Sequence, residues 1–460
     1  MKIKIPDTLI LLLGILLFFT ILTWIIPAGE FNREEVNGKE VVVSGSYHTI
    51  EAQPANLFQF LLAPIKGFIS SAQIIVFILF VAGAFGIINQ TKAIKVGLQS
   101  VVTLSQRRPA SKKFIIPILT ALFSLAGATF GMSEEVLVFI LITLPLSFSL
   151  GYDSLVGLSI PFIGAGAGFA GAFLNPFTVG IAQGIAELTP FSGWEYRLIV
   201  WLVFTLAATI FIMNYARKIE RDPANSPMYE LDQQSKYKNS QHELEKFTLA
   251  HKLIIVVFLL GLVMLIVGVN KYDWYINEIS ALFLVLGVLA AIIAKLTADE
   301  AVAAFIEGAA EMVKVCMVIA LAKGVLIIAS EGKIIDTILY TLSSAVEGYP
   351  KAVSIQLMFY TQSFLNFFLP SGSGQAALTM PIMSPLSDII GISRQTAVLA
   401  FQFGDGLSNM IIPTSGVTMG VLTLANVPYQ KWLKWAIPLM VIFFTLAMIM
   451  LLPPVLYFNW

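Results

Sequence analysis

Three carboxylates stand in strongly apolar or glycine-rich surroundings in this sequence. Glu134 and Glu135 follow Ser133 between two apolar runs, and Asp405 lies between two glycines. An ionisable side chain within an apolar segment is costly and by default indicates function. Such groups can bind a cation or a solute's amino group, or carry a proton. The alternative for the glutamates is capping, with Ser133 as the N-cap and the acids in the first helical turn. Asp405 is harder to explain in that way and is the strongest single candidate.

Hydroxyl and amide side chains accompany these acids. We predict that the substrate is bound by Ser133, Glu134, Asn175, Thr178, Ser373, Gln375, Asp405, Asn409, Thr414 and Ser415. Four of them are candidate oxygen ligands of Na⁺: Ser133, Asn175, Ser373 and Thr414. The alternative for any single serine or threonine is a hydrogen bond between packed helices. We predict no cofactor and no catalytic residue, and Na⁺ and H⁺ both stay open as a coupling ion.

The chain that holds these residues is very apolar. Hydrophobic residues make up 57% of its 460 residues and charged residues 12%, whereas soluble domains have about 25% charged residues. Many apolar runs approach the roughly 20 residues that cross a bilayer as a helix, and strand-like alternation is missing. The composition predicts an all-α membrane protein. A net charge of zero gives no reason to expect a nucleic-acid partner, and the single cysteine excludes a disulfide framework.

The apolar runs divide into full crossings and hairpins. We predict nine crossings, at residues 7–27, 69–90, 152–188, 196–215, 252–270, 277–295, 314–330, 394–426 and 434–457. Two re-entrant hairpins, 114–149 and 351–390, enter and leave on one side, and the crossings 152–188 and 394–426 are broken in the middle. Residues 1–215 then form an N-terminal half, 216–251 a cytoplasmic linker, and 252–460 a C-terminal half.

The positive-inside rule supports this layout. The basic residues that fall on one side are Lys2, Lys4, Lys92, Lys95, Arg107, Arg108, Lys112, Lys113, Arg217, Lys218, Arg221, Lys236, Lys238, Lys246, Lys252, Lys431 and Lys434. The loops on the other side are poor in lysine and arginine. We therefore expect a multi-pass protein of the cell membrane with its N-terminus in the cytoplasm.

The two halves repeat one another weakly. Gly131, Pro145, Gly151 and Pro176 are separated by 14, 6 and 25 residues, and Ser371, Pro385, Gly391 and Pro413 by 14, 6 and 22. The predicted topology gives the two copies opposite orientations. Paired broken segments in two inverted halves are the best sequence indication of a transporter site, because a broken helix frees backbone groups that must line a cavity or hold a ligand. The alternative is that glycine and proline only help helices to pack or kink.

Several of these segments resemble a known family. They are Gly-Met-Ser-Glu-Glu at 131–135, Asn-Pro-Phe-Thr-Val-Gly at 175–180, Leu-Pro-Ser-Gly-Ser-Gly-Gln at 369–375, Gly-Asp-Gly at 404–406 and Ile-Pro-Thr-Ser at 412–415. They look like the YfcC-type branch of the C4-dicarboxylate anaerobic carrier (DcuC-like) family, within the ion transporter superfamily. The resemblance covers nearly the whole chain. It implies a homodimer, a moving transport domain and elevator-type alternating access, often coupled to Na⁺ or H⁺.

The residues themselves favour one substrate class. Neither hairpin tip and neither helix break contains arginine or lysine, so the predicted site is acidic and favours a basic amino acid such as arginine or ornithine. A Na⁺-coupled C4-dicarboxylate carrier is the alternative, supported by Lys323, a central lysine in the span 314–330. A membrane-embedded enzyme is the alternative from another class. We find no metalloprotease motif, cysteine cluster or P-loop that would favour an enzyme or an ATP-driven pump.

Overall fold

The chain is mostly helical. The computed structural model describes residues 8–36, 39–43, 45–94, 96–97, 109–189, 191–235, 247–272, 274, 276–344, 346, 348–458 and 460. Some of the basic residues used above for orientation lie outside these ranges: Lys2, Lys4, Lys95, Arg107, Arg108, Lys236, Lys238 and Lys246. The predicted orientation therefore stays a prediction.

Most of the described helices overlap the predicted crossings and hairpins, whereas α2 and α16 were not predicted. The N-terminal half contains α1 (Thr8–Ile25), α2 (Leu57–Ser70), α3 (Ala72–Gln90), α5 (Pro109–Phe130), α6 (Val136–Ser149), α7 (Ser154–Ala170), the π-helical turn η1 (Pro176–Gly180), α8 (Ile181–Ile185) and α9 (Trp194–Arg221). The C-terminal half contains α12 (Leu249–Tyr272), α13 (Ile276–Ala294), α14 (Ala298–Ala310), α15 (Val313–Glu331), α16 (Ile335–Ser344), α17 (Lys351–Phe368), α18 (Gly372–Ile390), α19 (Arg394–Ser408), α20 (Gly416–Leu424), α21 (Tyr429–Leu451) and α22 (Pro453–Leu456).

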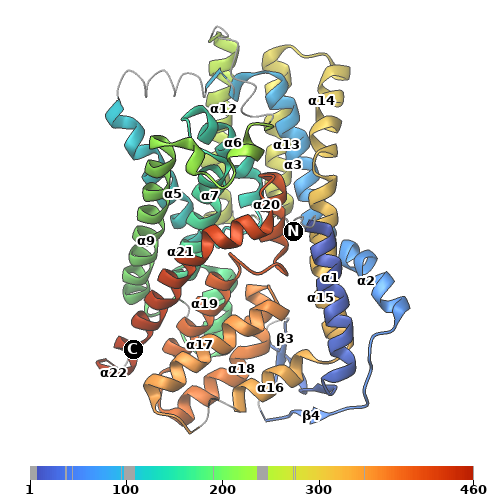
Figure 1. The fold of residues 1–460 in the computed structure, drawn as a ribbon, viewed down its shortest axis with the longest axis vertical. Coiled ribbons are helices and arrows are strands. Elements are labelled where there is room, and N and C mark those ends of the chain that lie inside the picture. The colour runs from blue at the N-terminus through green and yellow to red at the C-terminus, as the bar shows by residue number, and fades with distance from the viewer. Residues whose placement is uncertain are drawn as a thin grey trace.

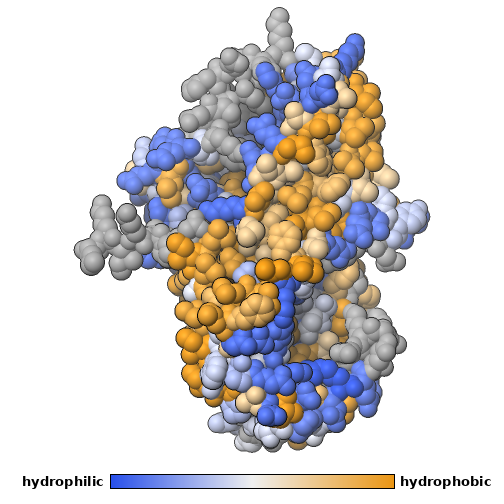
Figure 2. Space-filling view, turned by 90° about the vertical axis from the view of Figure 1, so that its right-hand side faces the viewer, coloured by the Kyte–Doolittle hydropathy of each residue, from blue (hydrophilic) through white to orange (hydrophobic). Residues whose placement is uncertain are grey.

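Among the described residues, five helical stretches are long and apolar enough to cross a membrane. They are Ala72–Gln90, Trp194–Arg221, Ile276–Ala294, Ala298–Glu331 and Tyr429–Leu456, and shorter apolar helices accompany them. Figure 2 shows a broad hydrophobic area on the face that carries α1, α2, α14 and α15, with hydrophilic residues gathered toward its lower end. Exposed apolar side chains on these helices include Ile10, Ile65, Val302 and Val313. Such a surface suits contact with lipid.

The two halves have matching packing. Helices α5 and α6 both pack against α7, and in the same way α17 and α18 both pack against α19. Helix α2 packs on α15 and α3 packs on α14, so that a pair of consecutive helices in one half crosses its counterpart in the other. Helices α7 and α19 meet in the middle of the molecule (Figure 1). Equivalent helices in the two parts of the chain therefore pack alike.

Small residues bring the crossing helices together. A Cβ added at Gly86 of α3 would lie 2.2 Å from the carbonyl oxygen of Ala304 and 3.2 Å from the Cα of Gly308, both in α14. A Cβ at Gly67 of α2 would lie 2.0 Å from the carbonyl oxygen of Ala320 in α15. Backbones that approach so closely are typical of small-xxx-small packing between membrane helices, where van der Waals contact replaces the hydrophobic driving force.

Two connecting segments contain structure that the sequence analysis did not expect. Four short strands, β1 (Gly29–Glu30), β2 (Arg33–Val36), β3 (Lys39–Val42) and β4 (His48–Thr49), form two antiparallel pairs, β1 with β4 and β2 with β3. They occur in a stretch expected to be a loop of an all-α chain. This stretch is charged and polar and forms no apolar helix. The strand pairs satisfy the hydrogen bonds of its backbone N–H and C=O groups instead.

The start of the predicted linker is folded onto the body of the protein. Helix α9 continues into it, followed by a 3₁₀ turn, η2 (Pro223–Asn225), and α10 (Tyr229–Asp232). The Asp153 carboxylate, which caps α7, accepts hydrogen bonds from the hydroxyls of Tyr215 and Ser226 at 2.5 and 2.6 Å. The Asp232 carboxylate accepts a hydrogen bond from the backbone N–H of Ser154 at 2.9 Å. The connection between the halves is therefore anchored where the first broken helix begins.

The close approach of α3 and α14 leads to a stability prediction. We expect Gly86→Val to lower the thermal stability of the detergent-solubilised protein, because overpacking typically costs about 1–3 kcal/mol. Gly14→Val is the matched control, because Gly14 has nothing within 4 Å of a built Cβ. Thermal unfolding followed by fluorescence-detected size exclusion measures both variants, and equal melting temperatures would contradict the packing described here.

Candidate functional site

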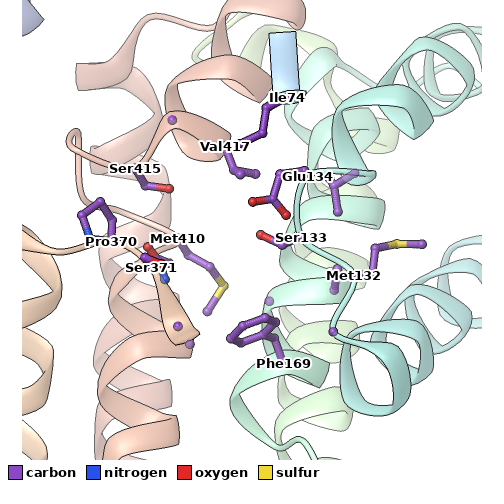
Figure 3. A pocket seen from close by; sticks show the side chains of 18 of the residues that line it. Ile74, Met132, Ser133, Glu134, Phe169, Pro370, Ser371, Met410, Ser415 and Val417 are labelled. Carbon is purple, nitrogen blue, oxygen red and sulfur yellow. The ribbon is translucent and has the colours of Figure 1, made fainter. Parts of the chain in front are cut away.

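A cavity lies where the two halves meet. It has a volume of about 280 Å³ and is called the central cavity below. Its walls come from both predicted hairpin tips, the chain around both predicted helix breaks, α15 and the start of α3. Figure 3 shows Ser133 and Glu134 on one side, Ser371, Met410 and Ser415 on the other, and Phe169 between them. The polar side chains that line it are Ser71, Ser133, Glu134, Thr178, Lys323, Ser371, Ser373, Asn409, Thr414 and Ser415.

The turn between α5 and α6 gives its two glutamates different surroundings. Gly131 enters the turn with φ +71°, a conformation that suits glycine. The Glu135 carboxylate is buried and accepts a hydrogen bond from the backbone N–H of Ser133 at 3.0 Å. Glu134 points its carboxylate into the central cavity (Figure 3). Glu135 therefore stabilises the turn before α6 without capping the helix, whereas the geometry of Glu134 suits contact with a solute.

The start of α18 forms the opposite tip. The Ser371 hydroxyl accepts a hydrogen bond from the backbone N–H of Gly374 at 3.4 Å and so caps this helix. Ser373 lines the central cavity, but Gln375 is buried behind it. The Gln375 side-chain amide donates to the backbone oxygen and the side-chain oxygen of Gln362 in α17, at 2.9 and 2.7 Å. Gln375 thus holds the second hairpin together.

The segments 152–188 and 394–426 are both interrupted beside the cavity, although Asp405 lies within α19 and not in the interruption that follows it. Helix α7 ends at Ala170, and the chain turns helical again at Pro176, where the Asn175 side-chain oxygen accepts a hydrogen bond from the Phe177 N–H at 2.9 Å. Helix α19 ends at Ser408 and α20 begins at Gly416, capped by Ser415. These caps satisfy part of the backbone that each break exposes.

Asp405 lies directly behind the second tip. It is fully buried, and its Oδ1 accepts a hydrogen bond from the Asn409 side-chain amide at 2.9 Å. Its Oδ2 has no hydrogen-bond partner among the described residues. A Cβ built on Gly372 would lie 2.8 Å from this oxygen and 2.5 Å from the Cγ2 of Thr178. The first turn of α18 therefore separates Asp405 from the solute space.

The structure places the ten predicted substrate residues in two groups. Seven line the central cavity: Ser133, Glu134, Thr178, Ser373, Asn409, Thr414 and Ser415. Three are buried behind its walls: Asn175, Gln375 and Asp405. Of the four candidate Na⁺ ligands, Asn175 is the one in the second group. The Thr414 hydroxyl donates to the backbone oxygen of Phe367 at 2.7 Å, which ties the second break to the end of α17.

The central cavity also contains residues that the predicted set omitted. Lys323 of α15 lines it, as Glu134 does. A lysine in the middle of an apolar span was the available signal. Phe169 and Met410, at the ends of the two broken helices, also line the cavity. Apolar residues in membrane helices are too common for either one to be identified from the sequence.

The two groups lead to an accessibility prediction. In a Cys316→Ala background, which removes the chain's one cysteine, we expect Ser133→Cys and Ser373→Cys to react with a small hydrophilic thiol reagent. Gln375→Cys should stay unlabelled, because position 375 is fully buried. Mass spectrometry of the labelled full-length protein measures the reaction. Labelling of all three at the same rate would contradict the assigned walls of the cavity.

Two solved structures match this chain over nearly its whole length, at low sequence identity. The crystal structure of the Alcanivorax borkumensis YdaH transporter covers 98% of each chain at 15% sequence identity, with a TM-score of 0.43. The structure of Neisseria gonorrhoeae MtrF covers 98% of this chain and 95% of its own, at 18% identity and a TM-score of 0.42.

Sequence comparisons identify the family. An Escherichia coli protein described as "Putative basic amino acid antiporter YfcC" is 34% identical, over 97% of this chain and 96% of its own. A Haemophilus influenzae protein is 28% identical over 94% of each chain. The pattern of the C4-dicarboxylate anaerobic carriers matches residues 5–455. Its apolar helices indicate a multi-pass membrane protein. The chain belongs to the C4-dicarboxylate anaerobic carrier family, a family of transporters.

Proposed function

We propose that this protein is a secondary active transporter that moves a basic amino acid through the central cavity by alternating access. The observation that carries the proposal is the presence of one acidic residue, Glu134, and one basic residue, Lys323, on the lining of the same cavity. An amino acid carries both a cationic and an anionic group. Glu134 is positioned to take the amino or guanidinium group, and Lys323 the carboxylate.

Other residues suit the rest of such a solute. Phe169 offers an aromatic face, and a guanidinium over an aromatic ring gains a cation–π interaction. Hydroxyl groups of Ser133, Ser373 and Ser415 line the same space. Asp405 lies behind Gly372 and adds negative potential to this side of the cavity. The name of the Escherichia coli relative supports the same substrate class and an exchange mode of transport.

A C4-dicarboxylate is the second candidate substrate, and Lys323 is the observation that favours it. It is the one cationic side chain among the described residues that line the central cavity. A dicarboxylate would meet the like charge of Glu134, which a bound cation would have to offset. Nothing in the described residues favours the third alternative, a membrane-embedded enzyme.

Coupling to Na⁺ or H⁺ forms part of the proposal. Asp405 is the proposed cation or proton site, because its carboxylate is buried with one oxygen left without a partner in the described part of the chain. Such a carboxylate is costly unless a cation, a proton or a rearranged donor compensates it. Thr178 lies beside the same turn of α18 and offers an oxygen.

The architecture forms a further part of the proposal. We propose two inverted halves with re-entrant hairpins 114–149 and 351–390, an elevator-type movement and a homodimer in the cell membrane with its N-terminus in the cytoplasm. The matching packing of α5, α6 and α7 with α17, α18 and α19 supports the repeat.

The substrate assignment is tested at Glu134. We expect Glu134→Gln to lower the uptake of labelled arginine into arginine-loaded proteoliposomes by at least about tenfold, because truncating one partner of a desolvated charge pair costs several kcal/mol. Glu135→Gln is the matched control, because glutamine keeps an oxygen for the Ser133 N–H. Parallel uptake of labelled succinate tests the second candidate. Full arginine uptake by Glu134→Gln, or uptake of succinate alone, would refute the assignment.

The coupling assignment is tested at Asp405. We expect Asp405→Asn to abolish the dependence of arginine uptake on an imposed Na⁺ or proton gradient, because the amide can neither hold a cation nor release a proton. Uptake is measured in wild-type and variant proteoliposomes with each gradient in turn. A variant that keeps the wild-type gradient dependence would rule out Asp405 as the coupling site.

A further inference from the structure

Lys323 projects into the central cavity from a helix that packs mainly away from the first hairpin. Its helix, α15, packs chiefly on α1, α2 and α20. Glu134 sits in the turn between α5 and α6, and these two helices pack chiefly on α7. The carboxylate and the ammonium group therefore belong to two packing units, α5 and α6 with α7 on one side and α15 with α1 and α2 on the other. The two units meet at α20, which packs on both α15 and α6, and residues of both line the central cavity.

The interaction between these two charges is a long-range one. Both side chains line the central cavity, but no ion pair within 4.0 Å joins them in the described part of the chain. Glu134 is the one carboxylate among the described residues that line the cavity, because Glu135 and Asp405 are buried behind its walls. The remaining neighbours of Lys323 in the cavity are neutral. The charges therefore attract each other across the space that a solute would occupy.

An attraction of this kind biases a two-state carrier. It acts while the first hairpin faces α15 and is lost when one packing unit moves past the other. Low polarity around the cavity strengthens it. A ligand shifts such an equilibrium only through the difference in its interactions with the two states. A solute that supplies its own cation to Glu134 and its own anion to Lys323 removes the bias.

We propose that Lys323 is an internal stand-in for the cationic group of the substrate, and that its attraction to Glu134 holds the empty carrier in one orientation. The inference deepens the proposed function, on which its flux measurement rests. It explains how the protein would favour exchange over net transport, because only the loaded carrier reorients freely. It also adds selectivity, because a dicarboxylate would neutralise Lys323 and leave Glu134 charged.

The first experiment compares exchange with net flux. Proteoliposomes loaded with labelled arginine are diluted into medium with or without external arginine. For the wild type we expect efflux with external arginine to exceed efflux without it by about tenfold, within the usual range of coupling between two sites. In Lys323→Gln this ratio should fall toward one at saturating arginine, and Lys323→Arg should restore it. Lys314→Gln is the control, since Lys314 is on the same helix but does not line the cavity.

The second experiment needs no substrate. Spin labels are placed at Ile118 of α5 and Val313 of α15, both exposed apolar positions, in the full-length Cys316→Ala protein. We expect the distance distribution of the empty protein to shift or broaden in Lys323→Gln and in Glu134→Gln. The double variant should match the single ones, because each removes the same interaction.

The outcomes separate this inference from the substrate assignment. A shifted distance distribution in a protein that does not exchange arginine would support the proposed attraction between Lys323 and Glu134, and it would refute arginine as the substrate. If Lys323→Gln exchanges arginine with an unchanged efflux ratio and an unchanged distance distribution, the proposed role of the Lys323–Glu134 attraction is overturned, while the substrate assignment stands. Additive effects in the double variant would also overturn this role, because Lys323 would then act through a group other than Glu134.

Discussion

The structure depends on how a chain this apolar satisfies backbone groups in the middle of a helix bundle. Each interruption near the centre is resolved locally: Asn175 caps the turn after α7, Ser371 caps α18 and Ser415 caps α20. Because short side chains perform these caps, the interruptions can approach one another and leave a space between them. The central cavity is thus a consequence of helix ends that must stay polar inside an apolar protein.

Polarity at these ends also determines which charges the cavity can contain. A carboxylate fully enclosed by protein, such as that of Asp405, needs compensation from inside the fold, whereas Glu134 faces open space and can exchange its partner. Lys323 reaches the same space from an unrelated helix. The cavity therefore combines one acidic and one basic group with hydroxyls, and the proposed amino-acid substrate rests on this balance.

Much of this arrangement could be predicted from the sequence, because glycine, proline and polar residues at repeated intervals directly indicate breaks and turns. The predicted broken segment 394–426 contains α19, an interruption and α20 as expected. The sequence did not predict which way individual side chains point. Ser373 and Gln375 are two residues apart on a helix, so they face different ways, and Gln375 turns toward α17. The proximity of Lys323 to Glu134 depends on packing between distant parts of the chain, which no local pattern records.

The backbone contacts between α3 and α14 carry an evolutionary consequence. Gly86 touches Ala304 and Gly308, whose side chains are already minimal, so a larger residue on one helix cannot be offset by a smaller one on the other. In ordinary cores, a larger residue at one position can be compensated by a smaller residue at its neighbour, but these positions do not allow such paired substitutions. In diverging relatives these positions should stay frozen, while the neighbouring lipid-facing side chains vary freely in shape.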